Sequence, residues 1–334
     1  MKRFRFLAII LALVVMIGSV QAQQSQSKVL TVYSPHPTDT INLGVKEFQE
    51  KTGIKVELVA AGTGELLKRI EAESANPLAD VLWGGGAESL QAYSQYFQKY
   101  VSSEDGAVNS KYKDPKHFWV GESPLPMVIM YNKKLVPENE VPKGWADLLH
   151  SNLKGKIAYA DPAKSGSSYT ILATLLTVFG KDTPKGWNFI RRFVANLDGK
   201  VLGSSATVYK GVADGEYNVG LTLEKEAIKY VKAGAEVGIV YPSEGTSAVP
   251  DAIAIVKGAK NLENAKIFVD FILSKDSQSV MSGAQSRRTV RKDVGAPAGL
   301  PDMGKIKLVK YDFNWAASQK ENLLKKWKDV VIGK

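Results

Sequence analysis

The strongest constraint on the fold is a repeated order of strand, glycine- or serine-rich loop and helix. Residues 29–33, 54–59 and 80–83 are short apolar runs that are typical of β-strands, and a helix-like segment follows each of them. The first of these segments, residues 38–51, carries apolar side chains about one turn apart and has a glycine just past its end. This order is typical of an α/β protein in which helices cover both faces of a parallel sheet.

The same rhythm continues in the second half of the chain. Apolar runs there predict five more strands, an apolar face predicts a helix at 262–274, and the Lys-rich tail at 315–332 is also predicted to be helical. The predicted strands cover residues 127–131, 157–160, 217–221, 237–241 and 252–256. A chain of 334 residues is long enough for two such units.

Two extended segments, 121–127 and 245–251, are predicted to cross between the units. Two crossing strands form a hinge, and a hinge between two α/β lobes leaves a cleft. We expect an N-terminal lobe made of residues 23–124 with 250–290, and a C-terminal lobe made of residues 125–249 with 291–334.

Residues 1–22 are typical of a secretory signal peptide. Three basic side chains precede an apolar run at 6–17, which is shorter than the ~20 residues of a membrane span. Val20 and Ala22 are small residues at the positions that a signal peptidase reads, so we expect cleavage after Ala22. A permanent N-terminal anchor is the alternative. No cysteine follows the cleavage point, which predicts a periplasmic protein without a lipid anchor.

The composition excludes several kinds of site. The chain has no cysteine and three histidines, so disulfides, thiolate metal sites and cysteine nucleophiles are excluded, and a zinc site with several histidines is not expected. The net charge of +10 falls to +7 without the three basic residues of the signal peptide. An exported protein is not expected to meet nucleic acid, so this charge indicates an anionic ligand, an anionic envelope surface or simply a basic exterior.

Five loops carry the hydroxyls and glycines that an anion site needs. In an open parallel sheet, ligands lie beyond the carboxyl ends of the strands, where helix N-termini present free N–H groups. The strongest loop is residues 164–168, because its glycine allows close backbone approach and its serines can donate to a phosphate or carboxylate. Each loop alone also fits an ordinary turn or helix cap. The five loops are 34–38, 62–64, 84–86, 165–168 and 204–207.

Three further features have two interpretations each. His36 stands between two prolines, either as a hydrogen-bond donor to the ligand or as a surface imidazole. Glu224 follows a predicted strand. Its carboxylate would either accept hydrogen bonds from sugar hydroxyls or an amine of the ligand, or lie in solvent at the start of a helix. The basic cluster at 287–292 either pairs with an anion or forms a solvated or docking surface.

Enzyme motifs are incomplete. No G-x-S-x-G motif is present, and Gly62-Thr63-Gly64 lacks the third glycine of a dinucleotide-binding loop. Residues 151–154 match S-x-x-K and 51–53 match K-T-G, as in penicillin-recognising enzymes, but in the reverse order. We therefore predict no catalytic residue, no metal and no cofactor, with an exported hydrolase as the alternative of another class.

The order of short segments resembles that of the periplasmic solute-binding proteins of ATP-driven (ABC) importers, in the branch of ferric-ion binders. The resemblance implies a type II periplasmic binding protein fold with a mostly parallel sheet in each lobe, a two-strand hinge, no catalysis, and delivery of the ligand to a membrane permease and its ATPase. The segments that carry it are Val-Tyr-Ser at 32–34, Asp-Val-Leu-Trp-Gly at 80–84, Met-Tyr-Asn-Lys-Lys-Leu-Val at 130–136, Pro-Lys-Gly-Trp-Ala-Asp-Leu-Leu at 142–149, Leu-Lys-Gly-Lys-Ile at 153–157, Asp-Pro at 161–162, Ser-Gly-Ser at 165–167 and Gly-Val-Ala-Asp-Gly-Glu at 211–216.

One departure from that family changes the expected ligand. Ferric binders have adjacent tyrosines just after the strand at 219–221, whereas this chain has Thr-Leu-Glu-Lys-Glu-Ala at 222–227. Fe³⁺ needs several anionic oxygens, so the chain is more similar to members that bind hexose phosphates or phosphonates. An Fe³⁺ binder is the alternative. By position, the resemblance implies ligand-binding roles for Ser34, His36, Thr38, Thr63 and Gly85 of one lobe, and for Ser165, Gly166, Ser167, Ser168, Ser205, Thr207 and Glu224 of the other. We expect a monomer with a small anionic ligand, which could also serve a chemoreceptor.

Overall fold

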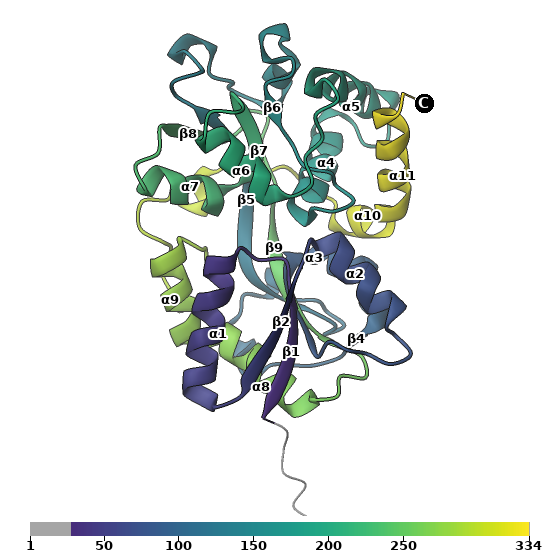
Figure 1. Cartoon of the computed structure of the whole chain (residues 1–334), viewed down its shortest axis with the longest axis vertical. Coiled ribbons are helices and arrows are strands. Elements are labelled where there is room, and N and C mark those ends of the chain that lie inside the picture. Colours follow the sequence, from purple (N-terminus) through teal and green to yellow (C-terminus); the bar gives the residue numbers. More distant parts are fainter. Residues whose placement is uncertain (1–27, 334) are drawn as a thin grey trace, which may run out of the picture.

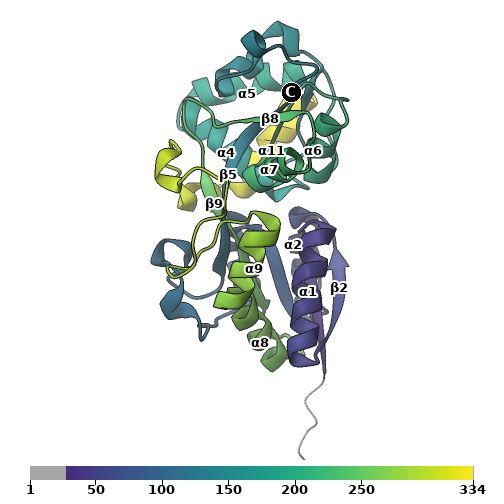
Figure 2. The ribbon, with the colours of Figure 1, turned by 90° about the vertical axis from the view of Figure 1, so that its left-hand side faces the viewer.

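The computed structural model describes residues 28–333, and the predicted signal peptide lies outside them. The chain forms two lobes, one above the other in Figure 1, and the turned view of Figure 2 shows the same division. Among the helices of the described residues, none is long and apolar enough to cross a membrane.

The N-terminal lobe is built on a sheet with helices on both faces. In the order β2, β1, β3, β9, the first three strands are parallel and β9 is antiparallel to β3. The short strand β4 also pairs with β9. The strands are β1 (Val29–Ser34), β2 (Lys55–Ala60), β3 (Val81–Gly86), β4 (Phe97–Gln98) and β9 (Ala248–Val256).

Alternate residues of these strands supply two apolar cores. Val32 and Trp83 face α1, α8 and α9, whereas Tyr33 and Leu82 face α2 and α3. Figure 1 shows these two groups of helices on opposite sides of the lobe. The helices are α1 (Thr38–Thr52), α2 (Thr63–Ala72), α3 (Ala87–Ala92), α8 (Leu262–Leu273) and α9 (Lys275–Gln285).

The C-terminal lobe repeats this design. Strand β7 lies between β5 and β6, and β8 pairs with β5. On one face of the sheet, Ile129 packs with α4, α5 and α11, and on the other face Val128 packs with α6 and α7. The strands and helices are β5 (Val120–Asn132), β6 (Ile157–Ala158), β7 (Val219–Leu223), β8 (Val237–Val240), α4 (Gly166–Phe179), α5 (Pro184–Leu197), α6 (Ser205–Ala213), α7 (Glu224–Lys232), α10 (Phe313–Ser318) and α11 (Lys320–Val331).

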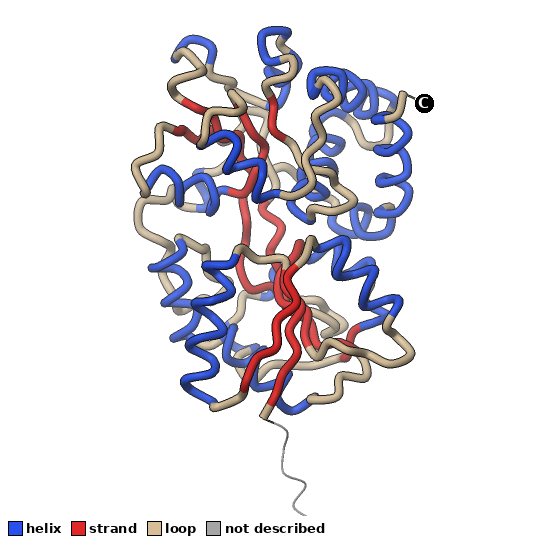
Figure 3. Tube along the Cα trace, in the orientation of Figure 1, coloured by secondary structure: helices blue, strands red, loops and turns tan. Residues whose placement is uncertain are grey.

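The two lobes are joined by a pair of antiparallel strands. The first half of β5 pairs with β9, with Leu125 opposite Val249 and Pro126 opposite Ala248, and the second half of β5 pairs with β7 and β8. Figure 3 shows β5 and β9 running from one lobe to the other. The predicted two-strand hinge is therefore confirmed.

The predicted α/β fold of type II periplasmic binding proteins is confirmed, with one difference in the sheets. Among the strands of residues 28–333, only the pairs β1–β2, β1–β3 and β6–β7 are parallel, so the sheets are mixed rather than mostly parallel. The reason is the hinge itself, because β5 and β9 run in opposite directions and each takes part in a lobe's sheet. The predicted tail helix at 315–332 is also two helices, α10 and α11.

The last third of the chain returns to both lobes. A bridge joins Arg291 to Val108 in the N-terminal lobe, and another joins Leu308 to Thr246 beside the hinge. Only then do Leu323 and Trp327 of α11 enter the core of the C-terminal lobe. The exact lobe boundaries stay a prediction.

Candidate functional site

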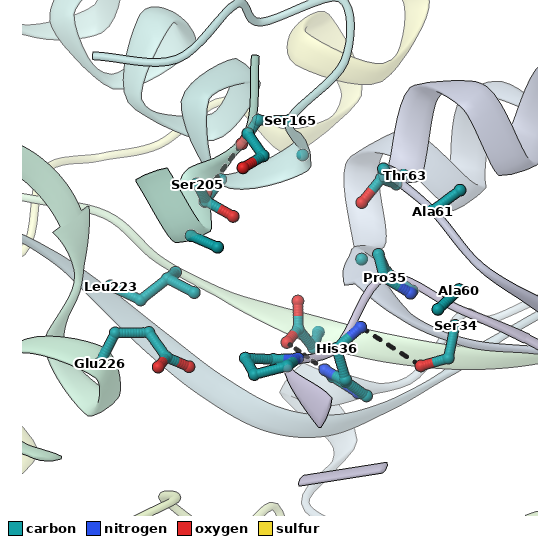
Figure 4. A pocket seen from close by; sticks show the side chains of 18 of the residues that line it. Ser34, Pro35, His36, Ala60, Ala61, Thr63, Ser165, Ser205, Leu223 and Glu226 are labelled. Atoms are coloured by element: carbon teal, nitrogen blue, oxygen red, sulfur yellow. Dashed lines mark hydrogen bonds and ion pairs between the residues drawn. The ribbon is translucent and has the colours of Figure 1, made fainter. Parts of the chain in front are cut away.

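A cavity of about 630 Å³ lies between the lobes, at the carboxyl ends of the N-terminal strands. The loops after β1 and β2 form one wall together with Gly85 at the end of β3, and the N-termini of α4, α6 and α7 form another. Figure 4 shows Ser34 and Thr63 on one side of the open space, with Ser165 and Ser205 on the other. This is the position at which open α/β sheets bind ligands.

Nine of the twelve residues predicted for the site line this cavity. They come from five separate segments, and the fold brings them to one space. They are Ser34, His36, Thr38, Thr63, Gly85, Ser165, Gly166, Ser167 and Ser205. Their contact with a ligand stays a prediction.

Three predicted residues do not line the cavity. Ser168 is buried on α4, where its backbone N–H donates to Ser165 Oγ at 3.3 Å. Thr207 turns back to cap α6, because its hydroxyl donates to the carbonyl of Ser204 at 2.6 Å. Glu224 accepts two hydrogen bonds from Arg288, at 2.7 and 2.9 Å, and one from Tyr241 at 2.5 Å. Its carboxylate is therefore engaged and not free for a ligand.

The serines of the C-terminal lobe stand at two helix N-termini. Ser165 is the N-cap of α4, and its Oγ lies 3.1 Å from Ser167 Oγ. Ser204 is the N-cap of α6. Both N-termini face the same cavity, so their N–H groups and hydroxyls place positive potential there.

Lys225 adds a full positive charge to this wall, and the sequence analysis missed it. Its side chain is 4% exposed and lines the cavity. Its Nζ lies 3.1 Å from Glu226 Oε1 in an ion pair, but among the described residues it makes no aligned hydrogen bond. A buried ammonium with free donors is costly unless an acceptor arrives. The available signal was the run of three charged residues that begins a helix directly after a buried strand.

His36 belongs to a buried network on the N-terminal wall. Its Nε2 lies 2.7 Å from Glu122 Oε1, and Trp83 donates to Glu122 Oε2 at 2.8 Å. The guanidinium of Arg287 lies 3.0 Å from the same carboxylate, and His36 Nδ1 lies 3.7 Å from Asp251. His36 is thus neither a surface imidazole nor free on both ring nitrogens.

The network fixes the charge of its members. Burial lowers the pKa of His36, although Glu122 acts in the opposite direction, so the imidazole is neutral at pH 7. Burial would raise the pKa of Glu122, but the charge of Arg287 and the contact with His36 outweigh it and lower this pKa to about 2. Glu122 is therefore a carboxylate at every physiological pH.

The wall also contains the residue types of a metal site. One ligand atom each of His36, Glu122 and Asp251 lies within 4.8 Å of the others. However, Arg287 and Trp83 already occupy both oxygens of Glu122. Tyr209 lines the cavity, but burial raises the pKa of its phenol, which opposes the phenolate that a ferric site needs. The network therefore fits Fe³⁺ poorly.

The two lobes touch along the mouth of the cavity. The N–H of Gly64 donates to the carbonyl of Lys164 at 3.3 Å, and Asp39 of α1 pairs with Lys229 of α7 at 2.5 Å. A Cβ on Gly64 would lie 2.0 Å from the carbonyl oxygen of Ala163. The structure therefore has a closed arrangement that requires glycine at this contact.

Comparison with known proteins places this geometry in a family. The model of the bacterial extracellular solute-binding proteins matches residues 76–314. The chain is 29% identical over 92% of its length to the periplasmic binding protein AfuA from Actinobacillus pleuropneumoniae, solved with fructose 6-phosphate bound. The match covers 99% of that chain with a TM-score of 0.85.

Three of the curated relatives illustrate the range of descriptions in the family. A probable ABC transporter periplasmic-binding protein of Sinorhizobium fredii is 29% identical over 74% of this chain and 70% of its own. The iron uptake protein A1 of Synechocystis sp. is 28% identical, covering 76% and 73%. A putative 2-aminoethylphosphonate-binding periplasmic protein of Salmonella typhimurium is 28% identical, covering 85% of both. The chain belongs to the bacterial extracellular solute-binding protein family and is a periplasmic solute-binding component of an ABC importer.

Proposed function

We propose that the ligand of this importer component is a small phosphorylated organic anion, such as a sugar phosphate or a phosphonate. The observation that carries the proposal is Lys225, a buried ammonium on the cavity wall whose donors make no aligned hydrogen bond among the described residues. A phosph(on)ate oxygen would satisfy it with a charge-assisted hydrogen bond.

The surroundings of Lys225 support an oxyanion rather than any other acceptor. Ser165, Ser167 and Ser205 supply hydroxyl donors, and the N-termini of α4 and α6 supply backbone N–H groups. Such a set replaces the hydration shell of an anion with fixed dipoles. AfuA, with its bound fructose 6-phosphate, and the Salmonella relative, named for a phosphonate, are consistent with this class.

The alternative cargo is Fe³⁺, which the triad of His36, Glu122 and Asp251 and the name of the Synechocystis relative favour. The ion pair of Glu122 with Arg287 argues against it, because the metal would have to displace a guanidinium. A hydrolase gains no support, since Ser151 of the S-x-x-K motif is exposed and does not line the cavity.

The proposed cycle uses the hinge. An open form admits the anion, closure brings Lys225 and the serines onto it, and the closed form delivers it to the permease. The contacts of Gly64 with Lys164 and of Asp39 with Lys229 would then form only on closure. The protein acts as a monomer in this proposal.

Thermal-shift assays and calorimetry on the mature chain test the ligand class. The probes are fructose 6-phosphate, 2-aminoethylphosphonate, inorganic phosphate and ferric citrate. A probe at 100 times its Kd should stabilise the fold by about 2.7 kcal/mol and raise Tm. We expect stabilisation by at least one phosph(on)ate. Stabilisation by ferric citrate alone, with a visible absorption band, would refute the proposal.

A further inference from the structure

A second polar group of the cavity lacks a close partner, and it has the opposite charge to Lys225. Asp251 lies on β9 and lines the cavity, and its side chain is 12% exposed. Its two ion-pair contacts are long, 3.7 Å to His36 Nδ1 and 4.0 Å to Arg287 Nη2. Within residues 28–333 its side-chain oxygens accept no hydrogen bond, so a nearly buried carboxylate faces the cavity with its acceptor capacity unused.

The neighbours of Asp251 do not balance its charge. Arg287 is the nearby cation, and it lies closer to Glu122, at 3.0 Å, than to Asp251. Glu122 is ionised and His36 is neutral. Two carboxyl groups, those of Glu122 and Asp251, therefore share one guanidinium, and the one that faces the ligand space is the farther from it.

The other carboxylates of the cavity wall are each engaged. Asp39 pairs with Lys229 at 2.5 Å, Glu226 pairs with Lys225 at 3.1 Å, and Glu65 accepts from the N–H of Gly62 at 3.3 Å. Asp251 thus differs from the other three in having no contact within hydrogen-bond distance. A largely buried acceptor left in this state favours a ligand that brings a donor.

We propose that Asp251 determines specificity by accepting a hydrogen bond from a donor group on the ligand. The donor is an ammonium or a hydroxyl, so the ligand carries an oxyanion for Lys225 and a donor for Asp251. The inference rests on the proposed function, because it concerns a second group, the hydrogen-bond donor, of the same anionic ligand. A plain alkyl phosphate or alkylphosphonate would leave Asp251 without a partner.

Two matched pairs of probes test this by calorimetry on the mature wild-type chain. 2-Aminoethylphosphonate against ethylphosphonate isolates the ammonium, and fructose 6-phosphate against hexyl phosphate isolates the hydroxyls. A hydrogen bond to a charged group predicts that the donor-bearing member of at least one pair binds tighter by roughly tenfold or more. The pair with the preference identifies the donor.

The variant Asp251→Asn assigns the preference to this residue. We expect the preference to fall below about threefold, while the plain member of the pair keeps its wild-type affinity. Asp276→Asn, the same change at an exposed position of α9, is the control and should leave both affinities unchanged. The Tm of each variant confirms that it is folded.

Each failure has a distinct meaning. Equal binding within both pairs in the wild type, or a preference that survives in Asp251→Asn, overturns the role of Asp251 and leaves the phosph(on)ate proposal intact. Absence of binding by all four probes refutes the proposed function, and the role of Asp251 falls with it.

Discussion

Replacement of Lys225 by methionine removes the charge that the anion is proposed to need while keeping most of the side chain's volume. The lost charge-assisted hydrogen bond is worth about 1.5–3 kcal/mol, so Kd for fructose 6-phosphate or 2-aminoethylphosphonate should rise by roughly 10- to 150-fold. The same change leaves Glu226, 5% exposed, without its cation. Breaking a buried pair costs about 3–5 kcal/mol, so the single variant should also have a lower Tm.

A double variant separates binding from stability. Lys225→Met with Glu226→Gln removes both charges, so no unpaired buried carboxylate remains, and much of the Tm should return. The affinity should stay low, because the ammonium is still absent. Lys257→Met, at an exposed position, is the matched control. Calorimetry that shows the double variant within twofold of the wild-type Kd would refute the role of Lys225.

Two further predictions concern closure and pH. Gly64→Ala should hold the lobes apart, because its Cβ would lie 2.0 Å from the carbonyl oxygen of Ala163. Small-angle scattering with saturating fructose 6-phosphate should then show a larger radius of gyration for the variant than for the wild type. An equal radius would contradict the closed contact. Burial lowers the pKa of His36, so below pH 6.5 the unfolded chain binds more protons than the folded one. The free energy of unfolding, measured with urea, should therefore decrease from pH 7 to pH 5, and it should decrease less steeply in His36→Gln. An equal pH dependence in the wild type and the variant would contradict this.

The fold followed closely from local pattern. The apolar runs of β5 and β7 and the apolar face of α1 are properties of single segments, so the local sequence was enough to predict them. The direction of the hinge strands could not be predicted in this way, because it depends on pairing between β5 and β9, which are more than a hundred residues apart in the sequence. This pairing is what makes the sheets mixed.

The site was predictable as a set of loops, but not as a set of partners. Glu224 was expected at the ligand because it follows a strand, yet its partner Arg288 comes from 64 residues away. Thr207 was expected for its hydroxyl, which its own helix end uses instead. Conversely, Lys225 and Asp251 stand out because their side chains have no hydrogen-bond partner among the described residues. The spacing of residues in the sequence cannot predict that a side chain will lack such a partner.

The position of Asp251 has a consequence for the order of events during capture. The residue lies on strand β9 opposite Ser123 of β5, where the chain passes between the lobes. Atoms beside an axis of rotation move least, so in the proposed closure about β5 and β9 this carboxylate would move little, whereas Lys225 would move with its lobe. Capture would then proceed in two stages. The donor group of the ligand binds Asp251 first, and closure of the C-terminal lobe then brings Lys225 to the oxyanion.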